Sequence, residues 1–75
     1  MRIEIKDVAT KKVIKELNPS SKLPIVIPQR KDELLIGGKL YKVYRSGFNY
    51  DHIERQMGQD VNILLITIWV DELNL

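Results

Sequence analysis

VNILLITIWV, at residues 61–70, is the segment that decides the fold of this chain. It is almost wholly apolar and rich in β-branched side chains, which are enriched in β-strands. Its apolar run is far shorter than the roughly 20 residues that a membrane-spanning helix requires. We therefore expect residues 61–70 to form the central strand of a sheet, with both faces suited to burial.

The N-terminal part of the chain predicts a hairpin beside this strand. Residues 2–8 alternate charged and apolar side chains, which is typical of a half-buried strand with Ile3 and Ile5 on its apolar side. Residues 9–12 then form a short connection, and residues 13–17 resume an apolar pattern that can pair antiparallel with the first strand.

Prolines shape the next segment. A turn is expected at residues 18–21, where Asn and Ser bond their own backbone and Pro19 removes a donor. Residues 23–28 are bracketed by Pro24 and Pro28, which confines them to an edge strand or to an extended arm over the core, with little pairing. Residues 29–33 read as a polar turn.

Gly37-Gly38 marks a second hairpin, because two glycines supply the positive φ angles of a two-residue turn. It joins expected strands at residues 34–36 and 39–45, and Gly47 suggests a bulge or a strong bend. Strict alternation would place the side chains of the second strand in two sets, Leu40, Lys42 and Tyr44 on one face and Tyr41, Val43 and Arg45 on the other.

Residues 51–59 allow two interpretations. Asp51 followed by Glu54 resembles a capping box, and Gly58 could end one or two turns of helix. Alternatively the strand continues to about Arg55 and turns at residues 56–60. We favour the strand and turn, because so short a helix is marginal without packing.

These elements predict one mainly β domain covering residues 1–75. Five to six short strands with at most one short helical turn describe a small SH3-like barrel or a strongly bent antiparallel sheet. An OB-like barrel is the second choice, since the chain is short for one and lacks a convincing helix between its middle strands.

One half of the chain resembles a known group of proteins. Pro28, the acidic pair Asp32-Glu33, the glycine turn and the Tyr41-x-Val43 strand, followed by an apolar last strand, are similar to small uncharacterised phage and mobile-element proteins. The resemblance implies an SH3-like β-barrel and carries no shared activity. Lys31 stands where those proteins usually have glycine.

Composition and charge limit the classes of function and the cellular location to be expected. Cysteine is absent, and the net charge is only +2, although residues 1–50 carry +6 and residues 51–75 carry −4. The N-terminus, MRIEIKDV, lacks the apolar region of a signal peptide, so we expect a cytoplasmic protein, in the host cytoplasm if it is phage-encoded, with no membrane partner.

Catalytic chemistry is not indicated. The single histidine, His52, has only Asp51, Glu54 and Ser46 as candidate partners and reads as a solvated loop residue. Asp51, His52 and Glu54 are too close in sequence to converge on a metal, and the glycine pair leads into a strand rather than a phosphate-binding helix. We expect no enzyme, no catalytic residues, no metal and no cofactor.

The aromatic and basic segment at residues 39–50 is the candidate binding surface, because it contains four of the five aromatic residues. The predicted binding residues are Lys42, Tyr44, Arg45, Phe48 and Tyr50. In the plainer interpretation, Tyr41 and Val43 fill the core, Phe48 covers one end of it, and the other aromatics are ordinary amphipathic surface residues.

Two functions remain open for that surface. The first is a non-catalytic protein-interaction module, such as a phage or mobile-element accessory protein or a self-associating subunit, using aromatic anchors and a strand edge near residues 25–27. The alternative is a small barrel that binds single-stranded nucleic acid. Salt dependence separates them, because phosphate contacts weaken steeply with ionic strength.

Overall fold

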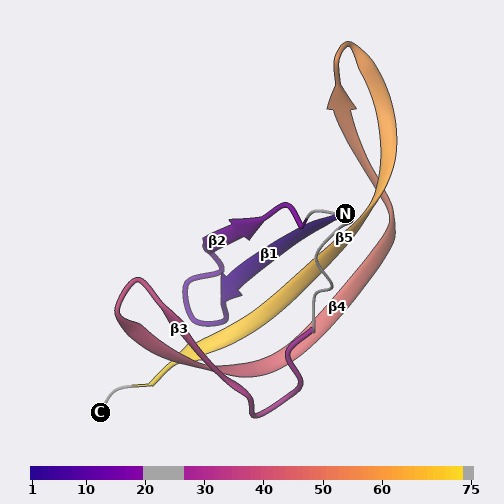
Figure 1. Cartoon of the computed structure of the whole chain (residues 1–75). Helices are drawn as coiled ribbons and strands as arrows, with labels where there is room; N and C mark the ends of the chain where they lie inside the picture. The colour runs from indigo at the N-terminus through magenta and orange to yellow at the C-terminus, as the bar shows by residue number, and fades with distance from the viewer. Residues whose placement is uncertain (20–26, 74–75) are drawn as a thin grey trace.

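The computed structural model describes residues 1–19 and 27–73, and these form one five-stranded sheet without a helix (Figure 1). Its strand order is β2-β1-β5-β4-β3. The strands are β1 (Arg2–Asp7), β2 (Val13–Leu17), β3 (Glu33–Ile36), β4 (Lys39–Gln56) and β5 (Gln59–Glu72).

The mainly β prediction is confirmed, in the form of a bent, open sheet. Within the described residues the two edge strands, β2 and β3, do not pair with each other, so no barrel closes. One pair also departs from the predicted antiparallel arrangement, because β1 runs parallel to β5 while every other pair is antiparallel.

The central position of residues 61–70 is confirmed, since β5 lies between β1 and β4. Its even-numbered residues Ile66, Ile68 and Val70 are buried, whereas the odd-numbered residues of 61–70 are only half-buried, so one face rather than both is fully covered. β1 adds Ile3 and Ile5, which pair with Ile66 and Ile68 in the parallel register. Hydrophobic burial along this one face is the main source of stability in a sheet that has no second layer in the described residues.

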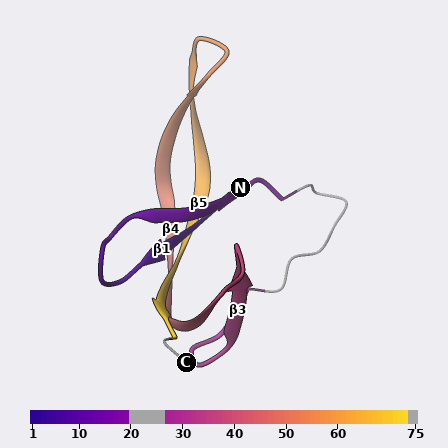
Figure 2. The same ribbon diagram turned by 90° about the vertical axis from the view of Figure 1, so that its left-hand side faces the viewer.

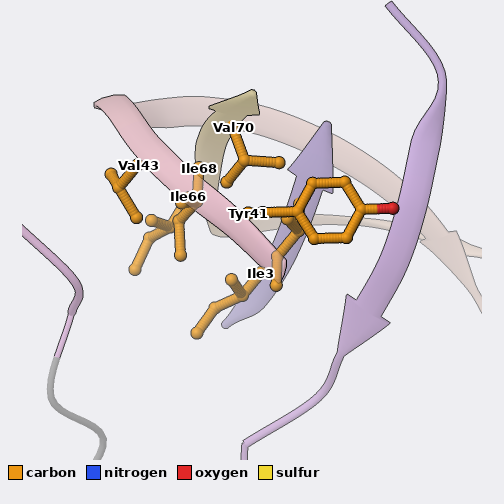
Figure 3. Packing of buried hydrophobic residues seen from close by; sticks show 7 residues of the cluster. Ile3, Tyr41, Val43, Ile66, Ile68 and Val70 are labelled. Carbon is orange, nitrogen blue, oxygen red and sulfur yellow. The ribbon is translucent and has the colours of Figure 1, made fainter. Parts of the chain in front are cut away.

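Tyr41 and Val43 of β4 complete the buried cluster (Figure 3). The prediction that these two side chains fill the core is therefore confirmed. The Tyr41 hydroxyl points away from the cluster. Partly buried side chains from the rest of the chain pack against it, and they are Ile14, Ile27, Leu34, Ile36 and Leu64. The edge strands therefore curve toward the same apolar face. Of the predicted proline-bracketed arm, residues 23–26 lie outside the described part.

Left-handed backbone appears at the turns. Gly37 and Gly38 have φ angles of 59° and 79°, which confirms the two-residue hairpin turn between β3 and β4. Lys31 has a φ of 80°, so it adopts the left-handed backbone conformation that favours glycine. Its N–H donates to the Val43 carbonyl at 3.0 Å.

β4 and β5 form one long hairpin that runs on beyond the other strands (Figure 2). The helical interpretation of residues 51–59 is wrong and the strand interpretation is confirmed, because β4 continues to Gln56. Met57 and Gly58 make the turn, with φ angles of 50° and 79°. We call residues 48–64, which lie around this turn, the outer hairpin.

Two irregularities interrupt the β4–β5 register. Tyr44 is an extra residue between the pairs Val43–Val70 and Arg45–Trp69. The bulge moves Arg45 to the face opposite Val43, so the strict alternation that placed both on one face is wrong. The second irregularity lies between Asn49 and His52, whereas Gly47, the predicted bulge, pairs regularly with Thr67.

Long polar side chains cover the other face of β5. The Lys6 ammonium and the Arg45 guanidinium lie 5.4 and 5.6 Å from the centre of the Trp69 ring, and their strands flank β5 on opposite sides. Further along, the Glu54 carboxylate bonds Arg2 at 2.6 Å and His52 at 3.2 Å. His52 is therefore a half-buried strand residue, not the solvated loop residue that the sequence suggested.

Glu54→Gln is expected to lower the free energy of unfolding by about 1 kcal/mol, because a hydrogen-bonded carboxylate with a 12% exposed side chain loses its charge beside Arg2. The matched control is Asp60→Asn. It removes the charge from the Arg55–Asp60 pair, whose side chains are 72% and 68% exposed, and should cost about 0–0.5 kcal/mol. Urea unfolding followed by Trp69 fluorescence measures both, and equal effects would contradict the prediction.

Candidate functional site

Tyr44 is the centre of the candidate site. It lines three surface hollows, and it reaches all three because the bulge lifts it out of the regular ladder. The Phe48 hollow, of about 420 Å³, lies between the loop at residues 27–30 and the Tyr44–Phe48 part of β4. The other two hollows, of about 300 Å³ each, lie toward Lys42 and toward Trp69.

Basic side chains surround Tyr44. Arg30 and Arg45 line the Phe48 hollow, and Lys11 and Arg45 line the Trp69 hollow, with no carboxylate lining either one. The Lys42 hollow adds Lys42, Lys31 and again Arg30, with Asp71 as its acid. We call this set the Tyr44 surface; its members are Lys11, Arg30, Lys31, Lys42, Tyr44, Arg45 and Phe48.

The cations of the Tyr44 surface make no ion pair in the described part of the chain, where the pairs involve other basic residues: Arg2, Lys6, Lys39, His52 and Arg55. Lys42 lies across from Asp71 on β5 and from Glu33 on β3 in the sheet register, without reaching ion-pair distance of either. The surface thus carries concentrated positive charge although the whole chain is only +2.

The structure brings together most, but not all, of the predicted binding residues. Tyr44, Arg45 and Phe48 line one hollow, and Lys42 shares a second with Tyr44. Tyr50 is 70% exposed and lines none of the three hollows; it belongs to the outer hairpin. Tyr44 and Phe48 are 48% and 50% exposed.

Sequence reasoning missed three residues of this surface. Lys11, Arg30 and Lys31 come from the turn after β1 and the loop before β3, far from Tyr44 in sequence. In the sequence, the positive charge of these three residues was the one property that could have indicated a role in the site. No local pattern relates them to β4, because their proximity follows from strand order.

The loop at residues 27–32 is fixed against β4 by hydrogen bonds. The Lys31 N–H donates to the Val43 carbonyl at 3.0 Å, the Val43 N–H donates to the Asp32 carbonyl at 2.8 Å, and the Ser46 hydroxyl donates to the Pro28 carbonyl at 3.3 Å. The Asp32 carboxylate accepts the Gln29 N–H at 2.7 Å. The wall of the Phe48 hollow is therefore held in place.

A second feature is apolar. On the outer hairpin, Phe48, Tyr50, Ile53 and Met57 are exposed, the last two at 55% and 103%. β3 pairs only with Lys39 to Lys42 of β4, and β1 only with Leu65 to Val70 of β5. Within the described residues, the outer hairpin therefore has no strand neighbour on either side.

The residues weighed for catalysis do not converge. Ser46 pairs with the buried Ile68 and its hydroxyl bonds Pro28, while His52 lies on the opposite face, where it pairs with Ile63. His52 shares the Glu54 carboxylate with Arg2. Across residues 1–19 and 27–73, no group of three or more His, Cys, Asp or Glu side chains could hold a metal ion.

Comparison with protein-family models, with curated proteins and with solved structures found no match to this chain. In the part of the chain that is described, no helix is long and apolar enough to cross a membrane.

Proposed function

We propose that this protein is a non-catalytic protein-interaction module and that its outer hairpin is the contact surface. The observation that carries the proposal is an exposed apolar ribbon without strand neighbours in the described residues. Exposed strand edges offer unpaired N–H and C=O groups to another chain. Tyr50, which is 70% exposed, supplies an aromatic anchor of the kind enriched at interfaces.

Stability also favours a partner at this position. A two-stranded hairpin is marginally stable in water, and independent stability comes from additional strands or from packing. Phe48 pairs with Ile66 and lies on the core side of the sheet, yet half of it is exposed because the buried cluster ends near it. Strands added by a partner would satisfy the edges of the outer hairpin and cover apolar side chains beyond Phe48, such as Ile53.

We take the partner to be a second copy of this chain. In every copy the β4 edge of the outer hairpin has no partner strand among residues 1–19 and 27–73, so two outer hairpins related by a two-fold axis can pair edge to edge. Such pairing places the apolar faces of both copies on the same side and makes one continuous sheet. A phage or mobile-element accessory role is part of the proposal and rests on the sequence resemblance alone.

The test is the mass in solution across a wide range of protein concentrations. Light scattering should show a dimer that dissociates on dilution, and Ile53→Lys should give a monomer at every concentration because it places a charge on the apolar ribbon. Leu35→Lys is the matched control: Leu35 is 74% exposed but lies on β3, and this variant should dimerise normally.

A wild-type chain that stays monomeric at the highest concentration would overturn self-association. An Ile53→Lys variant that dimerises like the wild type would show that the contact lies elsewhere. Circular dichroism of each variant establishes that the sheet is retained.

A further inference from the structure

The Phe48 hollow combines aromatic and basic side chains in its walls. Its aromatic walls are Tyr44 and Phe48, each about half exposed, and its basic walls are Arg30 and Arg45. A volume of about 420 Å³ falls within the range of small-molecule sites. The hydrogen bonds that fix the loop at residues 27–32 to β4 make the hollow largely pre-formed.

Positive charge continues beyond the hollow along both sides of Tyr44. Lys31 and Lys42 extend it on one side and Lys11 on the other. Carboxylates lie beside this charge without forming an ion pair with it in the described residues. Glu33 and Asp71 flank Lys42 in the sheet register, and of the described acidic residues only Asp71 lines one of the three hollows. This row of basic side chains matches an extended ligand with repeating negative charge.

We infer that the Tyr44 surface binds single-stranded nucleic acid, with bases stacked on Tyr44 and Phe48 and phosphates between Arg30, Arg45 and Lys42. Base stacking on aromatic side chains and phosphate neutralisation by basic ones are the two elements of such sites. This binding goes beyond the proposed self-association and overlaps the outer hairpin only at Phe48.

A single strand fits better than a duplex. Tyr44 and Phe48 lie in and beside a hollow, so a base must leave its stack to reach their rings. Trp69 does not serve as a third platform, because the Lys6 and Arg45 cations already lie over its ring, 5.4 and 5.6 Å from its centre. The site therefore takes a short segment of one or two bases with their phosphates.

The experiment is a titration of a fluorescent single-stranded oligothymidine, followed by anisotropy at about 50 and 200 mM salt. Binding should weaken on the order of tenfold between these concentrations, as expected when two or three phosphates are neutralised. Tyr44→Ala should weaken binding at low salt by about tenfold, through the lost stacking.

Matched controls distinguish binding at the Tyr44 surface from general electrostatic attraction to the protein. Tyr50→Ala removes an aromatic side chain outside the hollows and should bind normally. The double variant Arg30→Gln, Lys42→Gln should lose affinity and flatten the salt dependence, whereas Arg55→Gln, which removes a cation of the outer hairpin, should do neither. The double variant also keeps the test valid if Tyr44→Ala does not fold.

Four outcomes would overturn the inference. They are no binding at low salt, unchanged affinity of both the Tyr44→Ala variant and the double variant, equal affinity for a duplex of the same length, and equal competition by an acidic polypeptide such as polyglutamate. The last two would identify a general polyanion surface without base recognition. Ile53→Lys leaves the Tyr44 surface intact. If this variant binds the oligonucleotide normally, the outcome for nucleic-acid binding is independent of the outcome for self-association.

Discussion

Ile66→Ala is expected to lower the free energy of unfolding by about 3–4 kcal/mol, because it opens a cavity in the centre of the buried cluster. Ile66 is 2% exposed and lies between Ile3 on β1 and Phe48 on β4 in the sheet register. A domain of this size has a total stability of only about 3–5 kcal/mol. The variant should therefore be largely unfolded, as measured by urea titration with Trp69, the single tryptophan, as the probe.

Ile53→Ala is the matched control, since it makes the same chemical change at a side chain that is 55% exposed. Measured at a protein concentration where the chain is monomeric, it should cost less than about 1 kcal/mol. Similar losses in the two variants would mean that the outer hairpin contributes to the stable core as much as β1 and the middle of β5.

Gly38→Val should lower the free energy of unfolding by about 2 kcal/mol. The reason is backbone conformation: Gly38 has a φ of 79°, and a β-branched side chain strongly disfavours the left-handed region. Steric contact is not the cause, because a Cβ added there would have no atom within 4 Å. Thermal unfolding followed by circular dichroism measures the loss.

Gly47→Val provides the contrast at a glycine with equally open surroundings. Gly47 has no positive φ and pairs regularly with Thr67 inside a strand, where valine is favoured over glycine. We expect unchanged stability or a gain of up to about 1 kcal/mol. A large loss in the Gly47 variant would show that this position needs glycine for a reason other than its φ angle.

Most of the secondary structure could be predicted from local patterns. The strands at residues 2–8, 13–17 and 61–70 were recognised because alternation and β-branched content are properties of neighbouring residues. The turn at Gly37 was recognised for the same reason, since its φ angle depends on the residue itself. The helix alternative at residues 51–59 shows the limit of prediction from local patterns. The capping signals of a helix are present there, but the segment pairs with β5 as a strand instead.

The candidate site was predictable in part. Tyr44, Arg45 and Phe48 were selected by residue type and do line one hollow. Their orientation was not predictable: the bulge at Tyr44 reverses the face of Arg45 and brings it to Trp69. A bulge has a weak sequence signal, since the register of β4 is set by its whole length of pairing with β5.

The sequence by itself determined the strands at residues 2–8, 13–17 and 61–70, the hairpin turn at Gly37-Gly38, and the central position of β5. Only the tertiary structure decided that β1 pairs parallel to β5, that the sheet stays open, and that Lys11 and Arg30 join Tyr44. The physical reason is that strand formation depends on neighbouring side chains. Strand order depends on burying Ile3, Ile5 and Ile66 together, which relates residues that are distant in sequence.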